Sequence, residues 1–430
     1  MKKILIGRGD ALGDLVLSTI LIEPLRRHFP NCEIYFIANP AFASLLDNHP
    51  NVAGVIKDPL PHRFSIAQLP KIWRWSRHIR KQRFDLFLGA WGSPKYAFLS
   101  RMAGIPIRVG HPWGIWNRLF YTLHSKIDPR DFTVHQAMRN LALSAALRLP
   151  ISESPINLGA LPPKKTDDPL VCIQLDAGHP RRVWPADRLI RIIHFILSRT
   201  DLSVVLFGKN SNAIADEVIQ HFSGNSRVRN LFGKLTPVDM KNLLSQSSLF
   251  IGADSGPLHL AAGLGVPTIG YYPTKIQNPM EWGPWKTPHV VFLSRFACRT
   301  VCHAGRCFKK GCDIPIPDSE IFDAVDGLLS GRIGVPSHPK KYWAQQTLTL
   351  GVVEPKREWI TKLSAEWYCI SLEPNLSISD IKNKMIQNNI NMLVFHKEKP
   401  GIKFRLARMW ASNYLFFFPQ IKTRAEWESL

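Results

Sequence analysis

A chain of 430 residues, 45% of them hydrophobic, can bury ordinary cores, which excludes a disordered protein and predicts two domains with room for an appendage. Its formal net charge of +22 predicts an anionic partner: a nucleic acid, a negatively charged membrane surface or a charged substrate. No run of about 18 uninterrupted apolar residues occurs, so we expect no membrane-spanning helix. Arg8 and Asp10 interrupt the first apolar run, which argues against an export signal and predicts a cytoplasmic protein with mostly reduced cysteines.

The first part of the chain alternates strands and helices, as a doubly wound α/β fold does. KKILIG at the start predicts a strand, RGDALGD a loop, and residues 15–29 a helix. We expect residues 1–155 to form one Rossmann-like domain. Its later strands are predicted at residues 33–38, 84–90 and 108–112, and its closing helix at residues 132–147.

A stretch rich in proline and polar residues, 150–169, is typical of a crossing between domains. Beyond it the same order begins again, with strands predicted at residues 170–175 and 203–208 and a helix at residues 212–222. We expect residues 168–330 to form a second Rossmann-like domain. Ligands of such paired domains bind in the cleft between them.

The second domain is organised around residues 250–273, FIGADSGPLHLAAGLGVPTIGYYP. The two apolar ends of this stretch predict buried parallel strands, and its middle predicts a turn and a short helix. Pro257 suits the first turn of a helix, and Gly256 lets the backbone approach a phosphate closely. The N–H groups of that turn would form an anion site. An ordinary strand-turn-helix capped by Asp254 or Ser255 has the same pattern, so both interpretations stay open.

From Asp254 onwards, the pattern D-S-G-P-x-H-L-A-A-x-L-G-V-P-T resembles the signature of glycosyltransferase family 9, the heptosyltransferases of lipopolysaccharide inner-core synthesis. The GDLV that starts at Gly13 is similar to the opening G-D-x-L motif of that family, and Trp184-Pro185 also corresponds to it. The resemblance covers residues 1–329. It implies the GT-B fold, in which two Rossmann-like domains face a cleft, and inversion at the anomeric carbon of a nucleotide sugar.

The resemblance also implies the partners. The expected donor is ADP-heptose, bound by residues 168–330. The expected acceptor is a lipid A-linked oligosaccharide that offers an acidic sugar or a heptose, bound by residues 1–155. No cofactor is expected, and the chemistry is expected to need no metal. A family-9 transferase of another sugar and a catalytically silent protein that binds a membrane surface stay open as alternatives.

Asp14 is, by resemblance, the general base that deprotonates the acceptor hydroxyl. Asp10 is a second candidate, and a carboxylate favoured only by the helix dipole is the structural alternative for Asp14. Arg182 stands where the family usually carries a lysine, and its retained charge would stabilise the leaving diphosphate. Arg181 could share this task, and a solvated loop arginine is the alternative.

Further residues are expected to contact the substrates. One of them, His259, could instead be a histidine that only packs between helices. Asn212 lies near the position where relatives place an acidic residue for the donor ribose, yet no acidic residue follows until Asp216. The implied donor-binding residues are Asp254, Ser255, Gly256, Pro257, Leu258, His259 and Asn212, and the implied acceptor-binding residues are Gly13, Arg63 and Lys95.

Residues 71–83, KIWRWSRHIRKQR, show a basic helical pattern with Arg74, Arg77 and Lys81 on one face. This pattern is typical of an interfacial helix drawn to anionic lipid, which predicts a peripheral protein on the inner membrane. A solvated helix and a part of the acceptor site are the alternatives. A nucleic acid would suit the charge, but the sequence shows no recognition module for one, so we expect no nucleic-acid partner.

Two segments lie outside these motifs. Four cysteines have a spacing unlike the usual zinc pairs, so a structural metal, a local disulfide and reduced thiols all stay open. Residues 337–430 predict a small α+β extension that could be a docking module, a membrane-contact patch or a packed extension. The cysteines are Cys298, Cys302, Cys307 and Cys312, and the extension has predicted strands at residues 367–372 and 392–396 around a helical pattern at residues 378–388.

Overall fold

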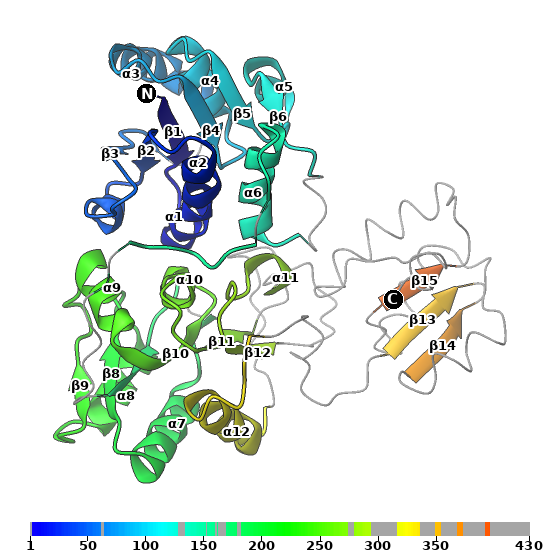
Figure 1. The fold of residues 1–430 in the computed structure, drawn as a ribbon. Coiled ribbons are helices and arrows are strands. Elements are labelled where there is room, and N and C mark those ends of the chain that lie inside the picture. Colours follow the sequence, from blue (N-terminus) through cyan, green and yellow to red (C-terminus); the bar gives the residue numbers. More distant parts are fainter. Residues whose placement is uncertain are drawn as a thin grey trace. The chain divides into compact units, whose positions relative to one another are not determined.

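The computed structural model in Figure 1 describes residues 2–61, 64–127, 134–151, 153–159, 161, 169–178, 182–273, 279–293 and 316–335, together with three later strands. The chain divides into two compact units, of which the first contains the two six-stranded sheets apart from the ends of two strands. The first unit is Met1–Tyr271, Trp282–Val291 and Pro317–His338, and the second is Tyr272–Glu281, Phe292–Ile316 and Pro339–Leu430. The proposed division into domains 1–155 and 168–330 stays a prediction.

The first sheet is parallel, with the strand order β3-β2-β1-β4-β5-β6. The four strands predicted for this region are confirmed. Two short strands, β3 and β6, were not predicted, because they lie at the sheet edges and contain no fully buried residue. The strands are β1 (Lys3–Arg8), β2 (Glu33–Ala38), β3 (Gly54–Lys57), β4 (Leu86–Gly89), β5 (Ile107–Gly110) and β6 (Leu123–His124).

The single helix predicted for residues 15–29 is divided into three elements. The hydroxyls of Ser18 and Thr19 donate to the carbonyls of Leu15 and Val16, both at 2.7 Å, and such bonds bend helices. The elements of this part of the chain are α1 (Leu12–Ser18), η1 (Thr19–Leu21), α2 (Ile22–His28), η2 (Ala43–Leu46), η3 (Ile66–Gln68), α3 (Leu69–Lys81), α4 (Pro94–Met102), α5 (Ile115–Phe120) and α6 (Gln136–Ala146).

The second sheet has the order β12-β11-β10-β7-β8-β9, and its pairs from β11 to β9 are parallel. The buried strands predicted on either side of the Asp254 turn are confirmed as β10 and β11. The strands are β7 (Leu170–Gln174), β8 (Ser203–Phe207), β9 (Val228–Asn230), β10 (Ser247–Ala253), β11 (Thr268–Tyr272) and β12 (His289–Leu293). The helices are α7 (Ala186–Arg199), α8 (Ala213–His221), α9 (Pro237–Ser245), α10 (Gly256–Gly263), α11 (Pro279–Trp282) and α12 (Asp318–Leu329).

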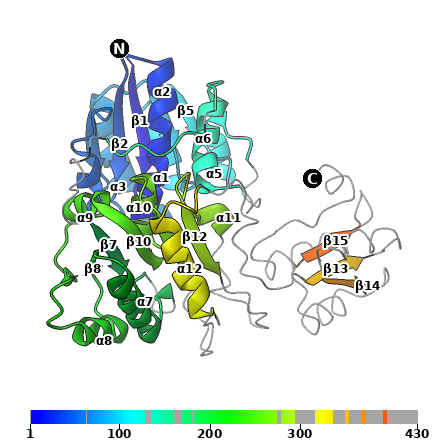
Figure 2. The same cartoon turned by 60° about the horizontal axis from the view of Figure 1, so that its bottom comes forward.

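Alternate residues of β1 point into two apolar cores on opposite faces of the first sheet. Ile4 and Ile6 belong to the core beneath α1, α2 and α6, and Leu5 belongs to the core beneath α3 and α4 (Figure 2). The α3 helix covers its core with Ile72 and Ile79, which lie on one helical face. Burial on both faces explains why β1 is a nearly continuous apolar run, as parallel strands require.

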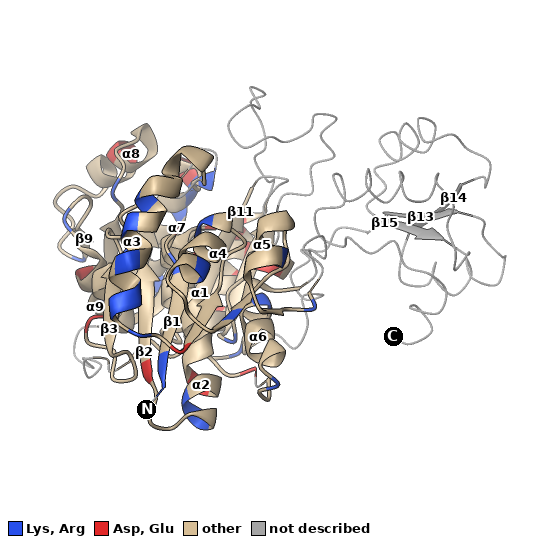
Figure 3. Ribbon diagram, turned by 90° about the horizontal axis from the view of Figure 1, so that it is seen from above, with Lys and Arg blue, Asp and Glu red and all other residues tan. Residues whose placement is uncertain are grey.

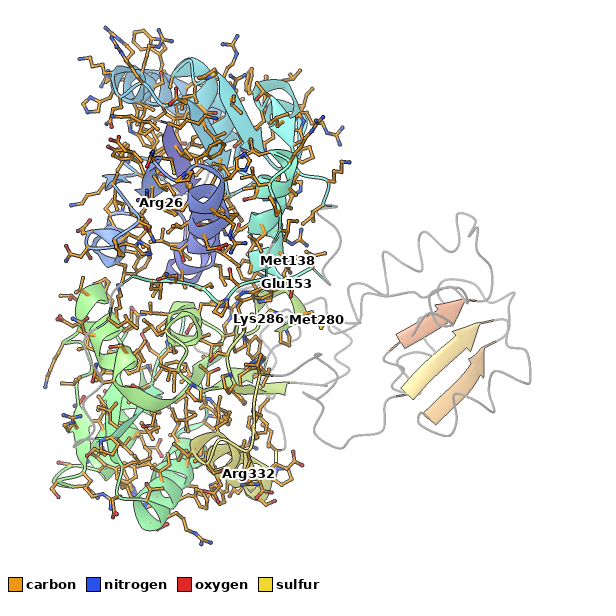
Figure 4. All side chains as sticks on the ribbon, viewed as in Figure 1. Arg26, Met138, Glu153, Met280, Lys286 and Arg332 are labelled. Carbon is orange, nitrogen blue, oxygen red and sulfur yellow. The ribbon has the colours of Figure 1, made fainter. Side chains whose placement is uncertain are left out.

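Residues 153–159 connect the part of the chain that forms the first sheet with the part that forms the second. Glu153 forms an ion pair with Lys286 at 2.7 Å, and Figure 4 labels both side chains. Lys241 of α9 donates to the carbonyl of Leu158 at 2.7 Å. These side-chain contacts hold the connecting segment in place on the elements of the second sheet.

The second unit contains a three-stranded parallel sheet with the order β14-β13-β15. The two predicted strands of the extension are confirmed as β14 (Tyr368–Leu372) and β15 (Met392–Phe395). Between them lies β13 (Thr349–Val353), which was not predicted. The predicted helix at residues 378–388 lies outside the described residues. Among the helices that the structure describes, none is both long and apolar enough to span a membrane.

Candidate active site

The predicted site residues follow the strands at which each sheet reverses its order, which is where α/β folds bind ligands. In the first sheet this point lies between β1 and β4, and in the second between β7 and β10. Asp14 lies in the first turn of α1, directly after β1. Arg182 lies after β7, and the Asp254 turn lies after β10.

Asp14 is held by an arginine that the sequence analysis did not select. Arg8, at the end of β1, is fully buried, and its guanidinium donates to Asp14 Oδ1, to the Ala90 carbonyl and, at 2.8 Å, to Asp10 Oδ1. The guanidinium also lies 5.0 Å from the ring centre of Trp91. Burial lowers the pKa of Arg8, and the Asp10 carboxylate opposes this shift. Both candidate bases therefore belong to one network around one buried cation.

Helices α1 and α10 cross in close contact at two glycines. An added Cβ at Gly13 would lie 3.2 Å from Cγ of His259 and nearer still to its Cδ2. An added Cβ at Gly256 would lie 2.7 Å from Cβ of Leu12. Larger residues at either position would push the helices apart. The crossing therefore brings the helix of Asp14 against the helix that carries the predicted phosphate turn (Figure 2).

His259 lies buried at this crossing. Burial, with a smaller contribution from His135, lowers the pKa of His259 to about 3, so its ring is neutral at physiological pH. Its ring stands edge-on to Trp282, with the centroids 6.2 Å apart. Among the described residues, Nδ1 of His259 has no hydrogen-bond partner. The sequence left helix packing and ligand contact open for this residue, and its contact with Gly13 gives it a packing role.

The Asp254 turn forms the N-terminal end of α10, as predicted. Ser255 is the N-cap residue, but its hydroxyl donates to Gln174 Oε1 at 2.8 Å instead of capping the helix. The N–H of Leu258 donates to the Ser255 carbonyl, and Pro257 has no N–H. The Leu258 N–H is thus used within the helix turn, and the predicted contacts of the Asp254 turn with the donor stay a prediction.

Arg182 and Asp254 lie together, although they are far apart in the sequence. Their nearest nitrogen and oxygen atoms are 3.8 Å apart, and the arginine side chain is partly exposed. The loop of Arg182 is anchored by Trp184, whose ring stacks on Tyr271 with the centroids 4.3 Å apart. The indole of Trp184 also donates to the Gly252 carbonyl at 3.2 Å. Arg181 lies outside the described residues.

Asp176, two residues after β7, fixes the loops beside the predicted donor residues and was not selected by the sequence analysis. Its Oδ2 accepts from the backbone N–H groups of Lys209 and Asn210, both at 2.9 Å, and so ties the loop after β7 to the loop after β8. In the latter loop Asn212 caps α8, with its Oδ1 accepting from the Ala215 N–H at 3.0 Å. The Asn212 amide nitrogen donates to two backbone carbonyls. The structure therefore gives Asn212 a capping role, and its predicted contact with the donor stays a prediction.

Lys95 is buried, and its ammonium lies 2.7 Å from Asp58 Oδ2 and 3.2 Å from the Pro61 carbonyl. The Tyr96 hydroxyl donates to the same carboxylate oxygen at 2.7 Å. Lys95 thus fixes the segment 58–61, and its predicted acceptor contact stays a prediction. Arg63 follows this segment and lies outside the described residues.

The described residues contain no group of three or more His, Cys, Asp or Glu that could hold a metal ion. The four cysteines between residues 298 and 312 lie outside these residues, so their three interpretations stay open. The two described cysteine thiols, Cys32 and Cys172, are buried and free.

Two six-stranded parallel sheets define the GT-B fold. Each has one point at which the strand order reverses, and each has helices on its faces. The solved ADP-heptose lipopolysaccharide heptosyltransferase II of Escherichia coli matches with a TM-score of 0.62 at 20% identity, over 77% of this chain and 99% of that one. Escherichia coli heptosyltransferase WaaC with ADP matches with a TM-score of 0.57 at 18% identity, over 68% of this chain and 93% of that one. The predicted fold class is confirmed.

The sequence profile of glycosyltransferase family 9 (heptosyltransferase) matches residues 72–311. The chain belongs to this family, as the Asp254 pattern predicted. Lipopolysaccharide heptosyltransferase 3 of Escherichia coli strain K12 is 22% identical over 336 residues, which cover 74% of this chain and 95% of that protein. The protein is therefore a glycosyltransferase by family.

Proposed function

We propose that the protein is an inverting transferase that moves a heptose from ADP-heptose to the inner core of lipopolysaccharide. The names of its relatives support ADP-heptose as the donor and lipopolysaccharide as the product, and the inner core is part of the proposal. The observation that carries the proposal is the crossing of α1 and α10, because it joins a carboxylate-bearing helix to a helix that follows an Asp-Ser-Gly-Pro turn. Helix α1 would thus carry the base for the acceptor, and the N-terminal end of α10 would bind the leaving diphosphate, on two helices that pack together.

In this mechanism the acceptor oxygen attacks the anomeric carbon from the face opposite the diphosphate. The new C–O bond forms, the bond to the diphosphate oxygen breaks, and its electron pair leaves with the diphosphate. The acceptor proton passes to Asp14. Arg8 would hold this carboxylate in place through its hydrogen bond to Oδ1. The acceptor hydroxyl becomes more acidic as the new bond forms, which suits a carboxylate as the base.

Arg182 would stabilise the negative charge that develops on the diphosphate. A guanidinium has five N–H donors, and one long contact of 3.8 Å to Asp254 leaves most of them for phosphate oxygens. The N-terminal end of α10 adds the positive end of the helix dipole to the same task. Preorganised charges of this kind favour the transition state over the bound donor.

The acceptor side of the site would be built on the first sheet. Gly13 lies next to Asp14 and against the ring of His259, and Arg63 follows the segment that Lys95 fixes through Asp58. Lys95 would hold this segment beside the acceptor, and its own contact with the acceptor is part of the proposal. An acceptor linked to lipid A requires the enzyme to work at the cytoplasmic surface of the inner membrane, so we propose a peripheral membrane location.

Replacing Asp14 with Asn tests the proposal, because it removes the base and keeps the shape. We expect transfer to fall below a tenth of the wild-type rate, while binding of ADP-heptose in calorimetry changes little. Asp47→Asn is the matched control, since Asp47 is exposed and lies far along the chain from the network around Arg8. A variant at position 14 that keeps more than a tenth of the rate would remove Asp14 from the base role.

The donor is tested with the purified wild-type protein, ADP-heptose and several other nucleotide sugars, each with a lipid A-type acceptor. Transfer from ADP-heptose alone supports the proposal. Preferred transfer from another nucleotide sugar would show that the protein is a family-9 transferase of a sugar other than heptose. Absence of transfer from every donor, with intact binding to vesicles, would favour a catalytically silent membrane-surface protein.

A further inference from the structure

Half of the net charge of the chain lies in one part of the first sheet and its helices. Residues 59–127 contain twelve Lys or Arg and one acidic residue, Asp85, which gives +11 of the total of +22. Helices α3, α4 and α5 all lie in this stretch, and none of them contains an acidic residue. The positive charge is therefore concentrated on one group of elements.

Four basic side chains of α3 are exposed on one side of the helix. Lys71, Arg74, Arg77 and Lys81 are exposed, whereas the opposite face of the helix is buried in the core. None of these four side chains forms an ion pair with a carboxylate of the described residues. Figure 3 shows the blue segments along α3. A field of this kind attracts a polyanionic surface.

Large apolar side chains are exposed on the same elements. The exposed fractions are 66% for Ile115 and 62% for Leu119 on α5, 69% for Ile66 on η3, and 53% for Trp73 on α3. Single exposed apolar residues are common on soluble proteins, but here four of them share a basic surface. Arg77 lies over the ring of Trp73 at 5.1 Å, so charge and aromatic surface are joined directly.

Packing shows that these elements form one surface. Helix α4 packs against both α3 and α5, and Figure 3 shows the three helices next to one another. Phe98 of α4 stacks on Phe64, which precedes η3, with the ring centroids 5.5 Å apart. Phe98 also contacts Trp116 of α5, with the centroids 5.3 Å apart. The exposed residues on η3 and α5 thus flank one aromatic cluster.

We propose that this surface, formed by η3, α3 and α5 around the largely buried helix α4 and here called the α3–α5 surface, docks on an anionic lipid bilayer. The lysines and arginines of α3 would meet the headgroups, and Ile115 and Leu119 would enter the boundary with the acyl chains. A tryptophan such as Trp73 favours this interface. Ile66, Ile115 and Leu119 are aliphatic and have no stacking surface for bases, so these three residues favour lipid over nucleic acid.

Vesicle co-sedimentation of the full-length protein tests the docking without any sugar substrate, so its outcome is independent of the proposed transfer. The vesicles contain phosphatidylethanolamine and phosphatidylglycerol, and vesicles of phosphatidylcholine alone provide the neutral comparison. We expect the protein to bind the anionic vesicles and to bind the neutral ones far more weakly. The binding should weaken with added salt, because exposed charges are screened over about 10 Å at 0.1 M.

Two variants divide the surface into its charged and apolar parts. The triple variant Arg74→Glu, Arg77→Glu, Lys81→Glu should bind at least about a hundredfold more weakly. The double variant Ile115→Ser, Leu119→Ser should bind about tenfold more weakly, and this loss should persist at high salt. The matched control for charge is Arg199→Glu, Arg229→Glu, Lys234→Glu, which changes three exposed basic residues outside the surface by the same amount.

Transfer to a short water-soluble acceptor separates docking from an acceptor site. Docking predicts that the triple variant keeps this activity, whereas an equal loss of soluble transfer and vesicle binding would assign α3 to the acceptor site. Equal vesicle binding by the triple variant, its control and the wild type would overturn the proposal. So would tighter binding of a short oligonucleotide than of vesicles, with no effect of the α5 changes.

Discussion

Gly13 sets the distance between α1 and α10, and replacing it with Ala tests whether that distance matters. The added Cβ would lie 3.2 Å from Cγ of His259 and nearer still to its Cδ2. Carbon atoms pack at about 3.5–4.0 Å, so the histidine ring or the helix must withdraw by about 1 Å. The ring is buried and stands against Trp282, which limits its freedom to move.

We expect Gly13→Ala to lower the free energy of unfolding by about 1–3 kcal/mol, as overpacking does in a filled core. A shift of about 1 Å between the base and the diphosphate site should lower the rate of transfer about a hundredfold. Rates are measured as release of ADP from ADP-heptose with a soluble acceptor. Stability is measured by urea unfolding.

The control for Gly13→Ala is Gly334→Ala, because an added Cβ at Gly334 meets no atom within 4 Å. The double variant Gly13→Ala, His259→Ala removes the ring that the methyl group meets, so it should recover part of the stability lost in the single variant. Wild-type rate and stability in Gly13→Ala would refute the argument that the helix crossing fixes the site geometry.

Arg8→Gln should lower kcat/KM for transfer, because it removes the guanidinium that holds the carboxylates of Asp14 and Asp10 in one network. Arg8→Lys should lose less activity, and a loss of stability with unchanged kcat/KM would reduce Arg8 to a structural residue. A second prediction concerns His111, His135, His259 and His289, whose burial lowers their pKa values to about 3 or 4. The unfolded chain binds their protons below pH 6.5 and the folded chain does not, so each should cost up to about 2 kcal/mol of stability between pH 7 and pH 5. Equal urea midpoints at these two pH values would contradict this prediction.

The strands that position the site could be predicted because their sequences are apolar on both faces. Strands β1, β7, β10 and β11 are runs of buried residues, and such runs stand out from their surroundings. Edge strands such as β3 and β6 are short and partly exposed, so their sequences resemble loops. The breaks between α1 and α2 depend on hydroxyl groups that bond back to the helix, which periodicity does not reveal.

The turn at Asp254 could be predicted because its residues are contiguous and each has a local role. Arg8 could not, because the burial of its charge depends on Ala90, which follows β4 and lies 82 residues further along the chain. Lys95 shows the opposite case. Its position after a strand favoured a ligand contact, but the carboxylate that binds it, Asp58, lies 37 residues earlier in the chain. Side chains that meet only through the fold leave no pattern in the sequence.

The network around Arg8 has an uneven charge. It contains one buried cation and two carboxylates, Asp10 and Asp14, so it carries one excess negative charge while both carboxylates are ionised. A proton accepted by Asp14 would leave a neutral pair of Arg8 and Asp10. Because the two carboxylates share one guanidinium, a change at Asp10 would alter the donors that Arg8 offers to Asp14. Asp10 would then act on the proposed proton transfer through Arg8, without a contact of its own with the sugar.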